Sequence, residues 1–183
     1  MSDLERLVAQ GTVRRDVPLG PMTTYKSGGP ARYFVEVPDG RALEALVGPG
    51  TTGGLPVLIL GRGSNLVVAD AGFPGLVIRL GAGFGQVEFE GTIVVAGAAV
   101  SLPRLARASV DRGLSGLEFF VGVPGSVGGA VRQNAGCFGH EIRDRLQHAV
   151  IFDLTDGSTR TASPEDLKMS YRYSNIEATD VVV

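Results

Sequence analysis

Glycine restricts the conformation of this chain more than any other residue type, because it accounts for 27 of the 183 residues, about twice its ordinary share. The densest stretch runs from residue 113 to 136, where glycines surround one proline. Such a stretch predicts a tightly packed backbone whose N–H groups are open to phosphate oxygens. The residues that we expect to contact a nucleotide there are Gly122, Val123, Pro124, Gly125, Ser126, Gly128, Gly129, Asn134, Ala135 and Gly136.

A second glycine motif follows an expected apolar strand earlier in the chain and consists of Gly61, Arg62, Gly63, Ser64, Asn65 and Leu66. Its two glycines permit a sharp turn that brings N–H groups and polar side chains close to a diphosphate. It is not a Rossmann fingerprint, because the third glycine is missing and a strand is expected next. The glycine-dense stretch lacks the Lys-Ser or Lys-Thr pair of a P-loop, which argues against nucleotide hydrolysis. An ordinary turn and a helix-packing segment are the alternative interpretations.

The composition indicates a folded protein with little net charge. Hydrophobic residues make up 44%, charged residues make up 20% and the formal net charge is -2, so neither disorder nor a nucleic-acid partner is expected. Cys137 is the single cysteine and there are two histidines, which argues against a disulfide framework and a metal site. Because no leader pattern opens the sequence and no apolar run approaches the ~20 residues of a membrane helix, we expect a cytoplasmic protein without membrane insertion.

Apolar spacing and turn residues predict a mixture of short helices and strands. The expected helices are a short one capped by Ser2, one at 41–47, one from Ser101 to Gly113 and a short one from Ser163. The expected strands are 32–37, 56–60, 66–68, 76–80, 92–96, the hairpin pair 149–154 and 158–162, and a strand that begins at residue 180. Residues 11–30 are expected to be irregular.

The two glycine motifs, in this order, resemble those of the UDP-N-acetylenolpyruvoylglucosamine reductase (MurB) family. The resemblance extends from about residue 23 to residue 183. It implies an α+β fold, an FAD-binding domain of the p-cresol methylhydroxylase (PCMH) or vanillyl-alcohol-oxidase type in which two α/β subdomains hold the flavin. The implied division is a lead-in at 1–22, the FAD-binding domain at 23–178 with subdomains at 23–70 and 71–178, and the start of a C-terminal substrate domain at 179–183.

The resemblance also implies an oxidoreductase of peptidoglycan precursor synthesis. NADPH would reduce a non-covalently bound FAD, and the flavin N5 would deliver hydride to the enolpyruvyl group of a UDP-sugar, giving UDP-N-acetylmuramate. The flavin performs the hydride chemistry, while the protein positions the reactants. Neither Cys137 nor His140 is expected to anchor the flavin, because a small packed thiol is the better interpretation of the cysteine. The sequence makes no prediction of an oligomeric state.

A third segment, Ser170-Tyr171-Arg172-Tyr173-Ser174, matches the Tyr-Arg-x-Ser motif of the family. The match implies that Arg172 holds the substrate carboxylate and the enolate that develops, because a planar guanidinium suits both. Tyr171 would support this arginine. Without the resemblance, an exposed arginine beside tyrosines is more typical of a surface stacking pair.

Two parts of the family's catalytic machinery have no counterpart in these residues. The family's proton-donating serine lies in a later Gly-Ser-Phe-Phe-x-Asn-Pro-like motif and its glutamate lies near the C-terminus, and neither pattern occurs here. We therefore expect a C-terminally truncated form that binds FAD and is inactive alone. The alternatives are another FAD oxidoreductase of the same fold and a non-catalytic FAD-binding module.

Overall fold

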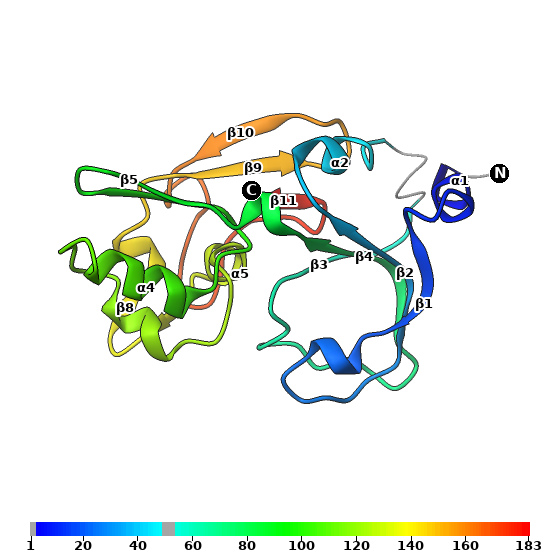
Figure 1. Ribbon diagram of the computed structural model, residues 1–183, viewed down its shortest axis with the longest axis horizontal. Coiled ribbons are helices and arrows are strands. Elements are labelled where there is room, and N and C mark those ends of the chain that lie inside the picture. The colour runs from blue at the N-terminus through cyan, green and yellow to red at the C-terminus, as the bar shows by residue number, and fades with distance from the viewer. Residues whose placement is uncertain (1–2, 49–53) are drawn as a thin grey trace.

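The computed structural model describes residues 3–48 and 54–183. Short helices and strands alternate along this part of the chain, as an α+β fold requires (Figure 1). In chain order the elements are α1 (Asp3–Ala9), β1 (Arg14–Pro18), η1 (Gly20–Met22), β2 (Pro30–Val37), α2 (Gly40–Glu44), β3 (Val57–Leu60), β4 (Phe73–Leu80), η2 (Ala82–Phe84), β5 (Val87–Glu90), β6 (Ile93–Ala96), α4 (Leu102–Val110), η3 (Glu118–Gly122), α5 (Val127–Gln133), β7 (Gly136–Cys137), β8 (His140–Glu141), η4 (Ile142–Asp144), β9 (Ala149–Asp153), β10 (Thr159–Ala162) and β11 (Asp180–Val182).

The first sheet lies on the right of Figure 1 and has the strand order β1-β2-β4-β3. β4 runs parallel to both β2 and β3, whereas β1 pairs antiparallel with β2. The carboxyl ends of the three parallel strands therefore lie at one edge. Because β4 belongs to this sheet and ends at Leu80, the expected subdomain boundary between residues 70 and 71 falls between two strands of one sheet, and we place the boundary after Leu80.

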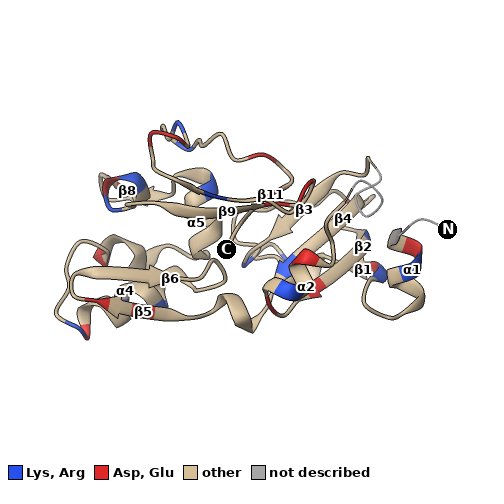
Figure 2. Ribbon diagram, turned by 90° about the horizontal axis from the view of Figure 1, so that it is seen from above, with Lys and Arg blue, Asp and Glu red and all other residues tan. Residues whose placement is uncertain are grey.

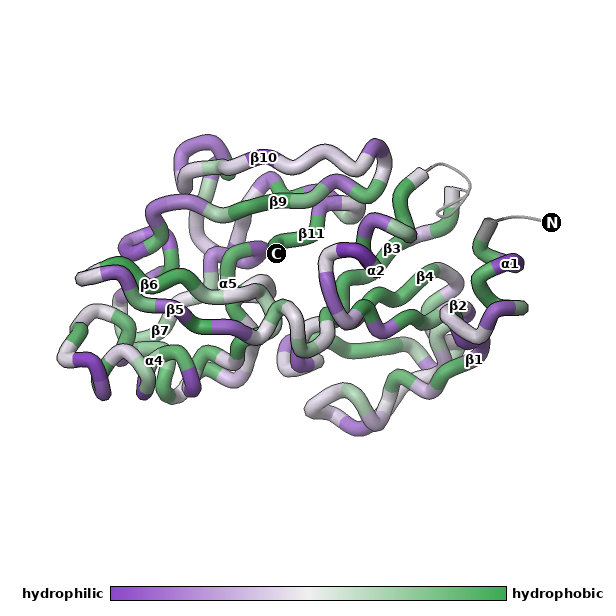
Figure 3. Tube along the Cα trace, turned by 45° about the horizontal axis from the view of Figure 1, so that its top comes forward, coloured by the Kyte–Doolittle hydropathy of each residue, from purple (hydrophilic) through white to green (hydrophobic). Residues whose placement is uncertain are grey.

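Apolar side chains cover both faces of the first sheet. On one face, Leu76 and Ile78 pack with α1 and α2, and Val181 of β11 joins the same cluster. On the other face, Phe34 and Val77 pack against the segments that precede β2 and follow β3. The strands β2, β4, β9 and β11 contain hydrophobic stretches (Figure 3). Since one cluster contains residues of both halves, burial of apolar surface holds the halves together.

The second half contains the sheet β10-β9-β11, two hairpins and the helices α4 and α5. β9 pairs antiparallel with β10 and with β11, which confirms the expected hairpin and the expected final strand. A cluster around Phe120, Val131 and Ile151 fills the space between the elements. Charged residues of both signs are scattered over both halves (Figure 2). None of the helices in the described ranges has the length and apolar content that a membrane crossing requires.

Two expectations about strands are wrong. Residues 14–18 form β1, although 11–30 was expected to be irregular, because the ladder with β2 holds this run despite its charges and its proline. Residues 66–68 form no strand. Val68 instead packs against the backbone of Gly28, where a Cβ would overlap it. The hairpin β5–β6 also begins earlier than the expected strand at 92–96.

The expected helices are confirmed except for the one that was to begin at Ser163. α4 has its proline in the first turn, as expected, but the side chain of Ser101 makes no capping hydrogen bond. At Ser163 the capping contact does form, since the N–H of Asp166 donates to Ser163 Oγ at 3.2 Å. The chain then turns away at Lys168, which has a left-handed φ of 47°. Ser2, the expected cap of α1, lies outside the described residues.

Candidate functional site

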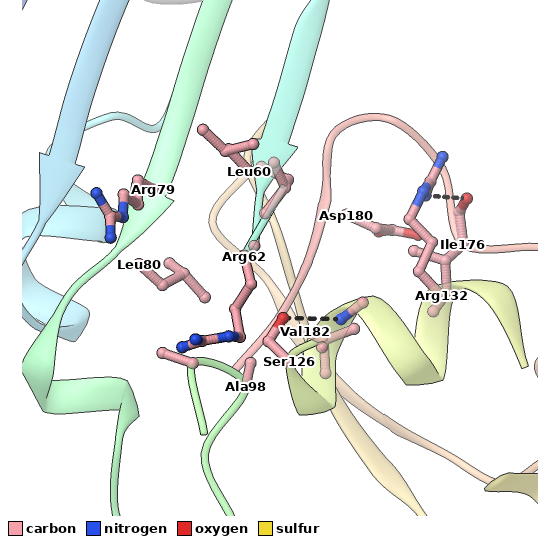
Figure 4. Close-up of a pocket in the computed structure, with 15 residues that line it drawn as sticks. Leu60, Arg62, Arg79, Leu80, Ala98, Ser126, Arg132, Ile176, Asp180 and Val182 are labelled. Atoms are coloured by element: carbon pink, nitrogen blue, oxygen red, sulfur yellow. Dashed lines mark hydrogen bonds between the residues drawn. The ribbon is translucent and has the colours of Figure 1, made fainter. Parts of the chain in front are cut away.

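A pocket lies between the two halves of the molecule, at the carboxyl ends of β3 and β4 (Figure 4). Its other walls come from the segment after β6, from α5 and from β11. The residues that line it are Ile59, Leu60, Gly61, Arg62, Arg79, Leu80, Ala98, Ala99, Ser126, Gly128, Gly129, Arg132, Ile176, Asp180 and Val182. Both glycine motifs thus contribute to one site.

The two motifs meet at Gly61 and Ser126. A Cβ on Gly61 would lie 2.6 Å from Ser126 Oγ, so glycine allows the end of β3 to approach the start of α5 this closely. Ser126 Oγ accepts the N–H of Gly129 at 3.4 Å and thereby caps α5. Gly125 lies next to the first motif as well, since a Cβ there would be 3.7 Å from Ser64 Oγ. The structure therefore joins residues that are far apart in the sequence.

The turn after β3 offers backbone donors. Gly63 has a φ of 64°, and its carbonyl oxygen accepts the N–H of Thr24 at 3.0 Å. Asn65 Nδ2 donates to Gln133 Oε1 at 2.6 Å, which ties the turn to the C-terminal end of α5. Among the described residues, no acceptor takes the N–H groups of residues 62–65. Successive free N–H groups in a turn are a common binding arrangement for anions.

The N–H groups at the start of α5 differ, because they are already used within the chain. Val127 donates to the carbonyl oxygen of Val100 at 2.9 Å, and Gly128 donates to that of Ala98 at 2.9 Å. The third donor, the N–H of Gly129, is hydrogen-bonded to the capping hydroxyl of Ser126. These glycines therefore allow close packing at the pocket wall, and the open backbone donors belong to the earlier motif.

Arginines give the pocket its charge. Arg62, Arg79 and Arg132 line it, and within the part of the chain that the structure describes no carboxylate pairs with any of them. Arg62 extends from the end of β3 toward Ala98 (Figure 4). Arg132 donates to the carbonyl oxygen of Ile176 at 2.6 Å. Unpaired guanidinium groups around a pocket favour a ligand with several negative charges.

Among the described residues that line the pocket there is one carboxylate, Asp180, and its charge is neutralised within the protein. Asp180 is almost fully buried and accepts two hydrogen bonds from Arg160, at 2.9 and 2.7 Å. These hydrogen bonds hold the pKa of Asp180 below its usual value, although burial acts in the opposite direction. The site therefore keeps an excess of positive charge.

Arg172 and Tyr171 lie in a tight turn and are not among the residues that line this pocket. Ser170 and Tyr173 exchange two backbone hydrogen bonds of 3.1 and 3.0 Å, and Arg172 between them has a left-handed φ of 56°. The guanidinium carbon lies 5.6 Å from the ring centre of Tyr171, so the two side chains also stack. Arg172 Nη2 donates to the carbonyl oxygen of Gly136 at 3.0 Å.

The other expected cofactor residues divide into three groups. Gly128 and Gly129 line the pocket, whereas Asn134 is fully buried and bonded within the chain. The remaining ones lie outside the pocket lining and are half-buried against hydrophobic clusters or exposed: Leu66, Gly122, Val123, Pro124, Ala135 and Gly136. No group of three or more possible metal ligands occurs among the described residues.

Comparison with known proteins agrees with this geometry. Residues 31–163 match the FAD binding domain family. The chain belongs to this family. It is 43% identical over 164 residues to the UDP-N-acetylenolpyruvoylglucosamine reductase of Parvibaculum lavamentivorans, and the matched region covers 90% of this chain and 52% of that protein. It is 44% identical over 174 residues to the protein of the same name from Synechococcus sp. strain RCC307, and the matched region covers 93% of this chain and 56% of that protein.

A solved structure agrees as well. The crystal structure of MurB from Thermus caldophilus matches with a TM-score of 0.78 and 36% sequence identity, over 93% of this chain and 59% of that one. The resemblance to the MurB family and the α+β, PCMH-type class of this FAD-binding domain are thereby confirmed. The chain spans about half the length of the curated relatives that it matches.

Several residues of the site were not predicted from the sequence. Arg79 and Arg132 were not singled out, because each is one of many arginines and no motif marks it. Asp180 was recognised only as the start of a strand. One signal for Arg79 was available, since it is a charged residue near the end of an otherwise apolar strand, where parallel strands place their ligands.

Proposed function

We propose that this chain is the FAD-binding part of an FAD-dependent UDP-N-acetylenolpyruvoylglucosamine reductase. One observation carries the proposal: three arginines without carboxylate partners among the described residues line one pocket between two subdomains, and one of them, Arg62, begins the turn whose N–H groups at residues 62–65 have no acceptor there. The diphosphate of a dinucleotide matches such a site in charge and in hydrogen-bond acceptors. The names of the relatives supply the reaction and the UDP-sugar substrate.

The residues of the pocket fit a non-covalently held FAD. The turn at 61–65 and Arg62 would bind the diphosphate, and the close contact of Gly61 with Ser126 would keep bulky side chains away from the cofactor. Leu60 and Val182 provide an apolar wall. When bound, the flavin supplies hydride transfer, with NADPH as the proposed hydride source.

Arg172 is the proposed ligand of the substrate carboxylate. Its guanidinium is exposed and its hydrogen-bonded partner is a neutral carbonyl oxygen, so its charge remains available to an anion. Negative charge that develops on the enolpyruvyl group would be stabilised by the same guanidinium. Tyr171 would fix the plane of the guanidinium by stacking.

The protein would act in the cytoplasm in peptidoglycan precursor synthesis. We expect these 183 residues to bind FAD without turnover, because no residue in them matches the serine or the glutamate of the family's catalytic machinery. Another FAD oxidoreductase of the same fold is less well supported, since the relatives with 43% and 44% identity carry the reductase name.

Titration with FAD, followed by flavin fluorescence, tests the cofactor assignment. We expect a yellow protein that releases FAD on denaturation. Arg62→Ala should weaken FAD binding about tenfold, because a charge-assisted hydrogen bond contributes roughly 1.5 kcal/mol, and binding by the parent should weaken as salt is added.

Arg41→Ala is the matched control, because Arg41 is an exposed arginine of α2 outside the pocket lining. It should leave the FAD dissociation constant unchanged. A colourless protein that takes up no FAD would refute the proposal, and equal losses in the two variants would refute the role of Arg62.

A further inference from the structure

We infer that Asn134 is a positioning residue for Arg172 and makes no contact with the flavin, an assignment that rests on the proposed function of Arg172. Asn134 ends α5 in a left-handed conformation with φ 43° and ψ 56°, and it is 0% exposed. Asparagine tolerates this conformation better than most residues with a Cβ. Its side chain is therefore directed by the fold into the protein interior.

Both N–H donors of the Asn134 amide are used inside the protein, and its oxygen accepts one hydrogen bond. Its Nδ2 donates to the carbonyl oxygen of Ser170 at 2.8 Å and to Glu141 Oε2 at 2.9 Å, and its Oδ1 accepts the N–H of Arg143 at 3.2 Å. An asparagine side chain has two N–H donors. Both are engaged here, so no donor of this amide is left for a cofactor.

These bonds hold the turn that presents Arg172. Ser170 is the first residue of that turn, and Asn134 fixes its carbonyl oxygen. On the other side of the turn, Ser174 Oγ donates to the carbonyl oxygen of Arg132 at 2.6 Å. The C-terminal end of α5 is thus hydrogen-bonded to the turn both before and after Arg172.

Arg172 needs such support because of its backbone. A left-handed φ of 56° in a residue with a Cβ is unfavourable and persists only when the surroundings fix it. Its guanidinium is bound to the carbonyl oxygen of Gly136, two residues after Asn134. The segment 134–136, which was expected to bind the flavin, therefore holds both Ser170 at the start of the turn and the side chain of Arg172. Because α5 begins at the pocket and ends at this turn, one helix sets the distance between the pocket and Arg172.

The variant Asn134→Gly removes the side-chain amide without straining the backbone, because glycine accepts a left-handed conformation. Ser109→Ala is the matched control, since it removes one buried side-chain hydrogen bond, Ser109 Oγ to the carbonyl oxygen of Leu105, in α4. Three measurements apply to the 183-residue protein: the FAD dissociation constant, the rate of tryptic cleavage after Arg172 relative to that after Arg41, and the Nε–H signal of Arg172 in a 1H–15N spectrum.

We expect Asn134→Gly to raise the relative cleavage after Arg172 about tenfold, because cleavage follows the population of the open turn. The Arg172 Nε–H signal should move toward the position of a free arginine, while the FAD dissociation constant stays within about twofold of the parent value. Ser109→Ala should change neither the relative cleavage nor the Arg172 signal. A loss of stability elsewhere in the protein is therefore distinguished from a loss of support for the turn.

An unchanged cleavage ratio and an unchanged Arg172 signal in Asn134→Gly would overturn the inference. So would a loss of FAD affinity as large as that of Arg62→Ala, because Asn134 would then contact the cofactor. Failure of the parent to bind FAD would refute the proposed function alone, since cleavage and the Arg172 signal report the turn without the cofactor.

Discussion

Single residues in this protein are fixed by contacts that their neighbours in sequence do not reveal. Gly61 is required by its close contact with Ser126, and Gly63 by its contact with Met22 at the end of η1, where a Cβ would overlap a carbonyl oxygen. Both belong to one motif, yet they contact different parts of the fold. The same holds for Asn134, whose motif implied contact with the flavin, whereas its side chain is hydrogen-bonded to Ser170 in the turn that carries Arg172.

Substitution of Gly63 tests this at the residue scale. Gly63→Ala should lower the free energy of unfolding by about 3 kcal/mol or more, because alanine meets both a left-handed φ and the carbonyl oxygen of Met22. Gly113→Ala is the control: φ there is 72° and no atom of the described residues lies within 4 Å of an added Cβ, so about 1 kcal/mol should be lost. Urea unfolding measures both, and equal losses would contradict the role of the close contact.

At the scale of elements, β11 holds the second half to the pocket. It pairs with β9, contributes Val182 to the pocket and presents Asp180 to Arg160 of β10. The ion pair therefore connects two strands that lie on opposite sides of β9. Asp180 also accepts the N–H of Glu177 at 3.0 Å, which closes the turn before β11.

Asp180→Asn should lower the free energy of unfolding at pH 7 by about 1–2 kcal/mol, an amount reduced from that of a fully buried pair because Arg160 is half-exposed. The pKa of Asp180 is lowered in the folded state, so its contribution is present above the unfolded pKa of about 3.9 and is lost as pH falls through the folded pKa.

The difference between parent and Asp180→Asn should therefore shrink below about pH 4. Thermal unfolding between neutral and acidic pH measures it. The exposed Glu90→Gln serves as control and should leave stability nearly unchanged. A constant difference at all pH values would show that the ion pair is not its source.

At the scale of the whole molecule, the two halves share a hydrophobic cluster and a pocket. Val181 packs with the first sheet, while Leu60 and Gly61 face α5 across the pocket. A ligand that fills the pocket contacts both halves at once. It should therefore stabilise them as one unit.

FAD at about 100 times its dissociation constant should add about 2.7 kcal/mol to the free energy of unfolding, which corresponds to a rise in Tm of roughly 5–10 °C for a protein of this size. Calorimetry should show a single transition that shifts as a whole. Riboflavin, which lacks the diphosphate, is the control and should produce a much smaller shift. A shift confined to part of the transition would show that FAD contacts one half only.

Much of the local structure was predictable from the sequence. The hairpin β9–β10, the helix α4 and the sharp turn at Gly61–Asn65 were expected from periodicity, proline and glycine, because these signals act within a few residues. β1 was not predictable in this way. Its charged run becomes a strand only because β2 provides a partner. The run at 66–68 has strand-forming residues but no partner.

The sequence by itself determined the family, the glycine motifs and the residue types that a flavin site requires. The tertiary structure alone decided how they meet: within the described residues the N–H groups of residues 62–65 stay free, whereas the N–H groups at the start of α5 donate to the carbonyl oxygens of Val100 and Ala98. It also brought Arg79 and Arg132 to the same pocket. The physical reason is that a motif fixes the chemistry of a short segment, while the charge and the free hydrogen-bonding groups of a site depend on which distant segments pack against it.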